Sequence, residues 1–205
     1  MSEARHAPAT LRNREPILQV LQRILPDAGS GPRLLLEIAS GTGEHAAYMA
    51  PLLPGWTWQP SDFEADALAG IDAHAKQSGC DRIRSAIRLD VQAADWPVRA
   101  ADAILCCNMI HIAPWAATGG LMRGAARVLP KGGLLILYGP FKRFGEHTAP
   151  SNAAFDADFL RARNPDWGVR CLDSEVRPLA ATHGLEMADV IEMPANNLTV
   201  VFRRR

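Results

Sequence analysis

Short apolar segments alternate with helical segments along this chain of 205 residues, and this order constrains the fold more than any other feature. Five short apolar segments bounded by turn residues are predicted to be buried strands, at 33–38, 56–59, 83–89, 101–108 and 134–138. Apolar side chains at helical spacing predict helices at 17–25, 44–53, 64–77 and 115–129, the first with Pro16 in its opening turn. Such an alternation builds a parallel sheet covered by helices on both faces.

The C-terminal part of the chain departs from this alternation. The segments expected there are helices at 153–163 and 175–183, and strands at 185–193 and 198–203. Pro178 should kink or shorten the second helix. Four residues, 194–197, join the two strands, and because so short a link cannot hold a crossover helix, an antiparallel hairpin is expected. The predicted fold is an α/β, doubly wound, mainly parallel seven-stranded sheet with one reversed strand, in a single domain over residues 1–205.

Charge and hydropathy narrow the range of functions. Lys and Arg number 22 and Asp and Glu number 22, so the chain is formally neutral, which argues against a nucleic-acid partner. The sequence has no apolar run of the roughly 20 residues that cross a bilayer, and its first residues lack the apolar core of a secretory signal, so a cytoplasmic protein without a membrane partner is expected. No metal site is predicted, because the four cysteines show no C-x-x-C spacing.

Glycines follow the first predicted strand, at the edge where doubly wound sheets bind their ligands. Gly41 and Gly43 allow a tight turn and a close approach of the backbone to a ligand, and the next helix offers free N–H groups. This G-x-G-x-x-A pattern alone suits a dinucleotide as well as any other nucleoside ligand.

Three acids stand at the ends of three successive strands. Glu37 lies beside the glycine turn, where a pyrophosphate would gain nothing from a negative charge but a cationic ligand would. Asp62 comes 19 residues after Gly43, where a carboxylate can accept hydrogen bonds from ribose hydroxyls. Asp90 could accept a hydrogen bond from an adenine amino group. Each acid alone could also be a salt-bridge partner or a helix cap, but together they favour a nucleoside with a cationic end.

The segment Glu37-Ile-Ala-Ser-Gly-Thr-Gly43 is similar to the first motif of class I S-adenosylmethionine-dependent methyltransferases, with Ala39 where the first glycine usually stands. Blocks along the chain resemble the methyltransferase-like 26 family, formerly a domain of unknown function. These blocks are 12–17, 38–45, 58–62, 108–114, 138–140, 151–152, 155–156 and 193–197.

The resemblance implies S-adenosylmethionine as cofactor, with S-adenosylhomocysteine as product. The cofactor-binding residues that it implies are Glu37, Ala39, Ser40, Gly41, Gly43, Asp62, Asp90, Val91, Asn108 and Met109. Asn108 is not followed by the Pro-Pro-aromatic pattern of enzymes that methylate nucleic-acid bases, so a small-molecule acceptor is expected, with a monomer or homodimer as the assembly.

Residues on the acceptor side are predicted from strand ends and from segments outside the core fold. His111 and Tyr138 follow the fourth strand and end the fifth, and either could act in catalysis or simply pack. The N-terminal segment 1–30 and an insertion at about 141–165 are expected to cap the active site. Their polar groups, with those of the last turn, include Arg12, Asn13, Asn152 and Asn196. Asn196 could equally serve as a turn residue with positive φ, and His147 is expected to be a solvated loop histidine.

Two other functions stay open at this point. A nicotinamide-dependent oxidoreductase could use Gly41, Gly43 and Asp62, although Glu37 and Asp90 would then have no role. A non-catalytic S-adenosylmethionine-binding protein would keep the same acids. Turnover with an acceptor separates an enzyme from the second of these.

Overall fold

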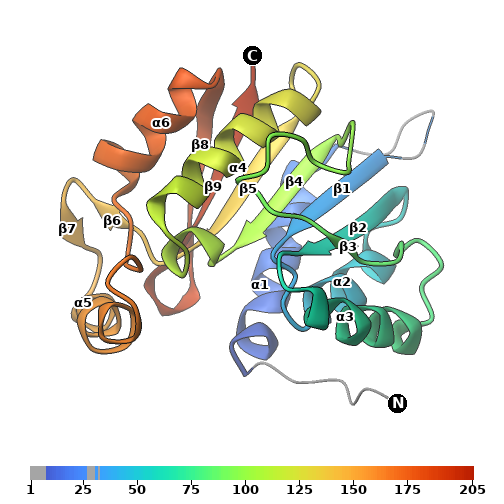
Figure 1. The fold of residues 1–205 in the computed structure, drawn as a ribbon, viewed down its shortest axis with the longest axis horizontal. Helices are drawn as coiled ribbons and strands as arrows, with labels where there is room; N and C mark the ends of the chain where they lie inside the picture. Colours follow the sequence, from blue (N-terminus) through green and yellow to red (C-terminus); the bar gives the residue numbers. More distant parts are fainter. Residues whose placement is uncertain (1–7, 27–30, 32) are drawn as a thin grey trace.

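The computed structural model describes residues 8–26, 31 and 33–205, and its centre is one seven-stranded sheet (Figure 1). The strand order is β3-β2-β1-β4-β5-β9-β8. The strands are β1 (Arg33–Ile38), β2 (Trp56–Asp62), β3 (Ile87–Arg88), β4 (Ala103–Cys107), β5 (Leu134–Gly139), β8 (Leu185–Met193) and β9 (Asn197–Arg204). The pairs from β3 to β5 are parallel, and β9 is antiparallel to both β5 and β8. The predicted mainly parallel sheet with a C-terminal hairpin is confirmed.

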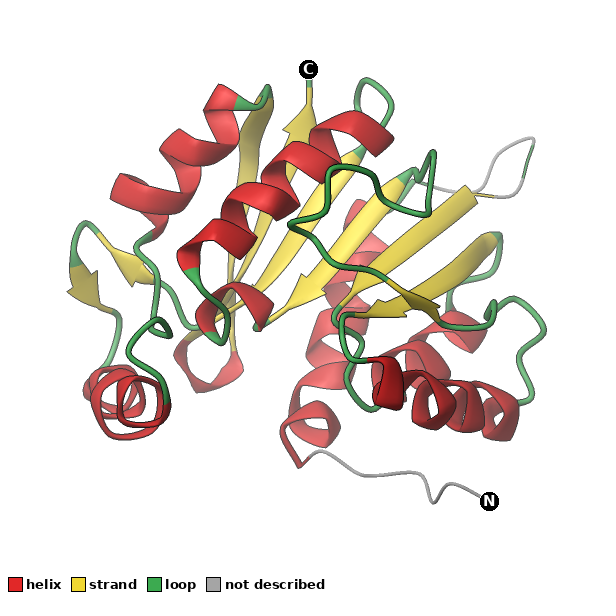
Figure 2. Cartoon of the chain, in the orientation of Figure 1, coloured by secondary structure: helices red, strands yellow, loops and turns green. Residues whose placement is uncertain are grey.

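Helices cover both faces of the sheet (Figure 2). The helices are α1 (Pro8–Ile24), α2 (Glu44–Met49), α3 (Ala65–Ser78), α4 (Trp115–Val128), α5 (Pro150–Ala154) and α6 (Arg177–Thr182). The first three lie on one face, and α4 and α6 lie on the other (Figure 1). Within the described ranges, no helix combines the length and the apolar character that a bilayer crossing requires.

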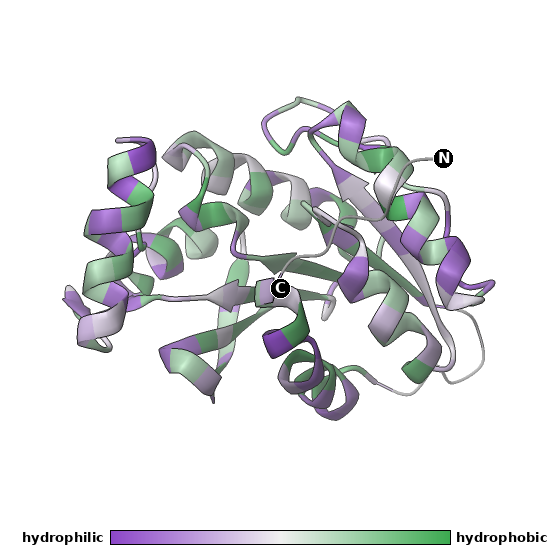
Figure 3. Ribbon diagram, turned by 90° about the horizontal axis from the view of Figure 1, so that it is seen from below, coloured by the Kyte–Doolittle hydropathy of each residue, from purple (hydrophilic) through white to green (hydrophobic). Residues whose placement is uncertain are grey.

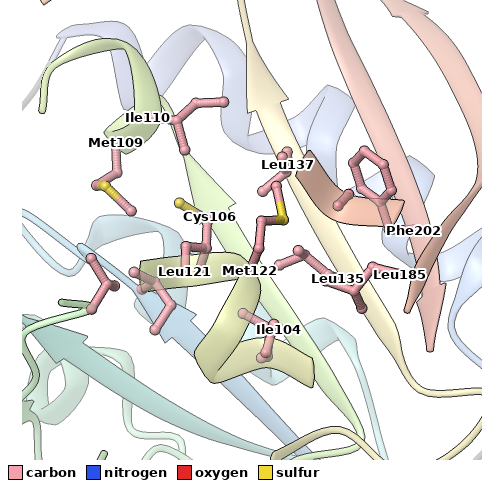
Figure 4. Close-up of a cluster of buried hydrophobic side chains, with 14 of the residues drawn as sticks. Ile104, Cys106, Met109, Ile110, Leu121, Met122, Leu135, Leu137, Leu185 and Phe202 are labelled. Atoms are coloured by element: carbon pink, nitrogen blue, oxygen red, sulfur yellow. The ribbon is translucent and has the colours of Figure 1, made fainter. Parts of the chain in front are cut away.

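Two hydrophobic cores result from the alternation of side chains along the strands. Leu35 packs into the core under α1 and α2, whereas its neighbour Leu36 packs into the core under α4 and α6. Figure 4 shows the second core, where Leu121 and Met122 of α4 meet Ile104 of β4. The strands in Figure 3 carry green, hydrophobic stretches, whereas the helices outside them carry both green and purple, hydrophilic residues.

Helix α1 begins at Pro8, two turns before the predicted start, and Pro16 lies inside it rather than in its first turn. Thr10, Asn13 and Ile17 are buried at helical spacing, so the added turns pack against the body of the protein. The periodicity of apolar residues could not detect these turns because their buried side chains are polar. Since Pro16 has no N–H, it cannot pair with the carbonyl four residues earlier.

Strand β2 continues through Pro60 to Asp62, beyond its predicted end at 59. The N–H of Trp58 donates to the carbonyl of Arg82, so by alternation the missing N–H of Pro60 also faces the β3 side. There β3 has not yet begun, and the Gln59 side-chain amide fills the gap by donating to the carbonyls of Pro60 and Ser85. The same gap reduces the predicted strand 83–89 to an isolated bridge at Ile83 and the two residues of β3.

The C-terminal helices also differ from the prediction. Helix α5 continues as a π-helix over Phe155–Arg161, and a π-helical turn at Leu172–Val176 leads into α6. Pro178 therefore lies in the first turn of α6, directly after the π-helical turn. A small hairpin of β6 (Lys142–Arg143) and β7 (Glu146–His147) precedes α5.

Candidate cofactor and acceptor pockets

Two adjoining pockets open at the carboxyl ends of the parallel strands. The glycine-loop pocket, of about 690 Å³, lies between the loop after β1, the end of β2 and the start of α3. The Tyr138 pocket, of about 500 Å³, lies between α1, the ends of β4 and β5, α5 and the β8–β9 turn. Both are bordered by Ala9, Asn13, Asn108 and Ile112. A ligand in one pocket would therefore lie beside a ligand in the other.

The glycine loop has a left-handed backbone at three places, with φ of 54° at Ala39, 59° at Gly41 and 85° at Gly43. At Gly43 a Cβ would lie 2.7 Å from the Cα of Ile71, so only glycine lets α3 approach this closely. Ala39 adopts the left-handed conformation with a side chain present, which is uncommon for a residue other than glycine. The loop thus keeps the turn of the glycine motif despite the alanine. Ala39, Ser40 and Gly41 line the glycine-loop pocket, and Gly43 supports it from behind.

Asp62 is held on the wall of the glycine-loop pocket by two backbone groups. The N–H of Gly41 donates to its Oδ2 at 2.8 Å, and the N–H of Glu64 donates to its Oδ1 at 3.0 Å. Each carboxylate oxygen keeps a further lone pair for a ligand. Asp62 therefore organises the turn before α3 and also presents an acceptor to the pocket.

Glu37 lies beneath the glycine loop and is buried, with 1% of its surface exposed. Its Oε2 accepts a hydrogen bond of 2.9 Å from Trp58 Nε1, and its Oε1 lies 3.7 Å from His45 Nδ1. Burial raises the pKa of the Glu37 carboxyl to about 7. Because a nearby cation would lower this pKa again, the charge of Glu37 is sensitive to what binds above it.

Asn13 of α1 connects the two pockets. Its Oδ1 lies 2.8 Å from His45 Nε2, and its side chain also hydrogen-bonds Tyr138. Burial lowers the pKa of His45 to about 4 and raises the pKa of Tyr138 to about 12, so both are neutral near pH 7. Sequence reasoning did not select His45, although it lies within the block 38–45 used for the resemblance. Its partner is 32 positions away, and no local pattern connects the two.

His111 is enclosed at the base of the Tyr138 pocket, with 1% of its surface exposed. The N–H of Arg170 donates to its Nδ1 at 3.3 Å, so Nδ1 is unprotonated and the ring proton belongs on Nε2. Among the described residues Nε2 has no hydrogen-bond partner. It faces Gly139, where a Cβ would lie 2.5 Å away. Burial, together with the Arg170 guanidinium, lowers the pKa of His111 to about 3.

Both segments expected to cap the site border the Tyr138 pocket with their described parts, whereas residues 1–7 and 27–30 of the first lie outside the described residues. Arg12 and Asn13 come from α1, and Asn152 and Phe155 come from the insertion. The Asn152 amide donates at 2.9 Å to the carbonyl of Asn196 and at 2.9 Å to the Thr148 hydroxyl. Asn196 itself has a φ of 57°, as expected of a turn residue. The β8–β9 turn is thus fastened to α5.

Asp156 connects the β6–β7 hairpin to the π-helix of the insertion. Its buried carboxylate lies 3.2 Å from Lys142 Nζ, 3.3 Å from His147 Nε2 and 3.3 Å from Arg161 Nε. The N–H of Val169 donates to it as well. The expectation of a solvated His147 is wrong, because its contact with Asp156 ties the β6–β7 hairpin to the π-helix.

Besides the supporting residues Glu37 and Gly43, three predicted cofactor residues border neither pocket. Asp90 accepts a hydrogen bond of 2.8 Å from the N–H of Gln92, so it stabilises a turn. Val91 packs against α4, where a Cβ at Gly120 would lie 2.4 Å from its carbonyl oxygen. Met109 points into the core beside Ile110 (Figure 4). A role for these three residues in binding stays a prediction.

Comparison with known proteins gives a family match and several similar structures. The sequence model of a family described as a protein of unknown function, DUF938, matches residues 4–204. An O-methyltransferase structure from Nostoc punctiforme, described as putative in its title, is 20% identical, covers 96% of this chain and has a TM-score of 0.80. The mitomycin 7-O-methyltransferase MmcR is 17% identical over 96% of this chain, with a TM-score of 0.79.

A third structure, described as PigF with SAH, is 21% identical over 94% of this chain, with a TM-score of 0.73. This chain spans 57%, 54% and 56% of the lengths of the three structures, in the order given. At these identities the similarity shows the fold alone, which is methyltransferase-like.

Proposed function

The chain belongs to the DUF938 family of proteins of unknown function, and we propose that it is an S-adenosylmethionine-dependent methyltransferase acting on a small molecule. The observation that supports this most is the pair of adjoining pockets, which share Asn13 and Asn108 as a wall. A transfer reaction needs its donor and acceptor side by side in this way. The methyltransferase-like fold places both pockets at the strand ends where such sheets bind ligands.

The residues of the glycine-loop pocket suit the cofactor. Its volume lies within the range of about 300–1,000 Å³ typical of ligand pockets. Asp62 would accept hydrogen bonds from the ribose hydroxyls, and the loop from Ala39 to Gly41 would lie against the cationic amino-acid end. Glu37 beneath it would be held in its ionised form by that positive charge. When bound, S-adenosylmethionine supplies an electrophilic methyl group on its sulfonium.

The protein's own residues would bind, align and shield the reactants. Asn13 and Asn108 would set the boundary between donor and acceptor, while α1 and α5 would exclude water from the Tyr138 pocket. A small acceptor is supported by the size of this pocket. The similar structures add support, because their titles name a mitomycin 7-O-methyltransferase and a protein with bound SAH.

Calorimetric titration with S-adenosylmethionine, S-adenosylhomocysteine and NADH tests the proposal. We expect binding of the first two, lost in Asp62→Ala and kept in Asp95→Ala, a matched control at an exposed acid outside both pockets. Thermal melting of both variants checks that they fold. Binding of NADH alone would favour the oxidoreductase, and binding of none would contradict the proposal. Cofactor binding without S-adenosylhomocysteine formation from any acceptor would favour the non-catalytic alternative.

A further inference from the structure

The Tyr138 pocket has one formally charged side chain in its described lining, the guanidinium of Arg12. Arg12 is exposed on α1 and makes no ion pair with another described residue. A guanidinium donates strong, charge-assisted hydrogen bonds to a carboxylate oxygen. The charge of the pocket therefore complements an anion.

The two titratable groups deeper in the pocket, His111 and Tyr138, are not available as bases. The ring proton of His111 belongs on Nε2, because Nδ1 is occupied by the N–H of Arg170. Burial lowers the pKa of His111 to about 3 and raises that of Tyr138 to about 12, so neither group removes a proton from a ligand near pH 7. A phenol, an alcohol or an ammonium group would have to lose a proton before or during methylation. A carboxylic acid has already lost it, since its pKa is about 4.

Besides the amides of Asn13, Asn108, Asn152 and Asn197, the remaining lining is apolar and would hold the body of a small acid. Phe155, Ile112 and Pro140 face the pocket together with Pro16. The volume of about 500 Å³ limits the ligand to a small molecule.

From these observations, and resting on the proposed function, we propose that the methyl acceptor is a small organic acid, methylated on its carboxylate. Arg12 binds one carboxylate oxygen, and the other faces the wall formed by Asn13 and Asn108. That oxygen forms the new bond to the methyl carbon while the carbon–sulfur bond breaks and its electron pair stays on sulfur. The products are a methyl ester and a neutral thioether, and no proton moves.

The test is calorimetry on the full chain loaded with S-adenosylhomocysteine, which has no methyl group to transfer. Benzoate, benzylamine and phenol are titrated, because they share an apolar ring and differ in charge. We expect benzoate to bind at least tenfold more tightly than the other two, and Arg12→Ala to weaken benzoate about tenfold. Arg23→Ala, an exposed position on the same helix outside the pocket, should leave benzoate binding unchanged.

The inference is overturned if benzylamine or phenol binds as tightly as benzoate, if none of the three binds, or if the two arginine variants behave alike. Failure of S-adenosylhomocysteine to bind in the same experiment would overturn the proposed function as well, so the two failures are distinguishable.

A second measurement tests the protonation of His111 directly. ¹⁵N NMR of the imidazole should show the proton on Nε2, and a proton on Nδ1 would leave Nε2 free to act as a base and contradict the inference. With saturating S-adenosylmethionine, the rate of ester formation should be flat between about pH 6 and 9, because the acceptor is ionised throughout. A rate that rises about tenfold per pH unit would indicate an acceptor that must first lose a proton.

Discussion

The two pockets share a wall but have opposite electrostatic character. Asp62, Glu64 and Asp66 line the glycine-loop pocket, whereas Arg12 is the charged side chain in the described lining of the Tyr138 pocket. Their construction differs too. The loop after β1, the end of β2 and the start of α3 form one side of the first pocket, whereas α5 and the β8–β9 turn close the second. The glycine-loop pocket therefore suits a cationic ligand and the Tyr138 pocket an anionic one. Two neighbouring pockets can in this way select reactants of opposite charge.

The largest expected effect comes from a steric collision at the glycine loop, which should disrupt the glycine-loop pocket. In Gly43→Ala the new Cβ would meet the Ile71 backbone at 2.7 Å, which no side-chain rotation relieves. We expect the free energy of unfolding to fall by about 3 kcal/mol and S-adenosylhomocysteine binding to be lost. Denaturant titration and calorimetry measure both. Gly41→Ala is the control, because its Cβ meets nothing within 4 Å and only the positive φ is strained. Equal losses in the two variants would contradict the collision.

The buried acid beneath the glycine-loop pocket should affect the pH dependence of the free energy of unfolding. Glu37 has a pKa of about 7 in the folded protein and about 4.3 unfolded, so the folded state holds the extra proton. Between these values its contribution to stability falls as pH rises, by about 4 kcal/mol in total. His45 and His111, with lowered pKa values, act in the opposite direction below about pH 6.5. The difference between the wild-type and Glu37→Gln curves isolates Glu37, and a flat difference would refute its raised pKa.

A substitution beside the Tyr138 pocket should leave cofactor binding unchanged. In Gly139→Ala the new Cβ would lie 2.5 Å from His111 Nε2, so the ring must move. We expect a loss of about 1–3 kcal/mol in the free energy of unfolding. Benzoate binding should weaken while S-adenosylhomocysteine binding is unchanged. If both ligands weaken together in calorimetry, the pockets are not separable in this way.

The smallest expected effect concerns the shared wall. Asn13→Ala removes the partner of His45 and of Tyr138, which should lower the free energy of unfolding by about 1–2 kcal/mol. Both ligands should then bind more weakly, unlike the result for Gly139→Ala. Gln19→Ala, an exposed position of α1 that bonds only Glu15, is the matched control. An effect confined to one pocket would show that Asn13 does not connect them.

The sequence predicts the glycine-loop pocket better than the Tyr138 pocket, for a physical reason. Gly41 and Asp62 follow strands that local apolar patterns reveal, so their meeting is a consequence of the parallel sheet. The contact between Asn152 and Asn196 joins segments 44 positions apart, and no local pattern encodes it. The tautomer of His111 likewise depends on a backbone N–H 59 positions away.

Errors in element boundaries have the same origin. The opening turns of α1 bury Thr10 and Asn13, so their polar character hides them from a test of apolar periodicity. Pro60 continues β2 because the neighbouring strand is absent at that point, which only the three-dimensional pairing reveals.

The position of β9 has a consequence for folding kinetics. This strand follows β8 in sequence but lies between β5 and β8, so β8 cannot join the sheet until β9 has paired with both. The pairing of β9 with β5 joins distant parts of the sequence, such as Leu134 and Arg203. Such a pairing loses much chain entropy before it gains contacts, which slows folding. The turn that connects these strands also forms part of the Tyr138 pocket. Completion of the sheet and completion of that pocket are therefore a single late event as the chain folds.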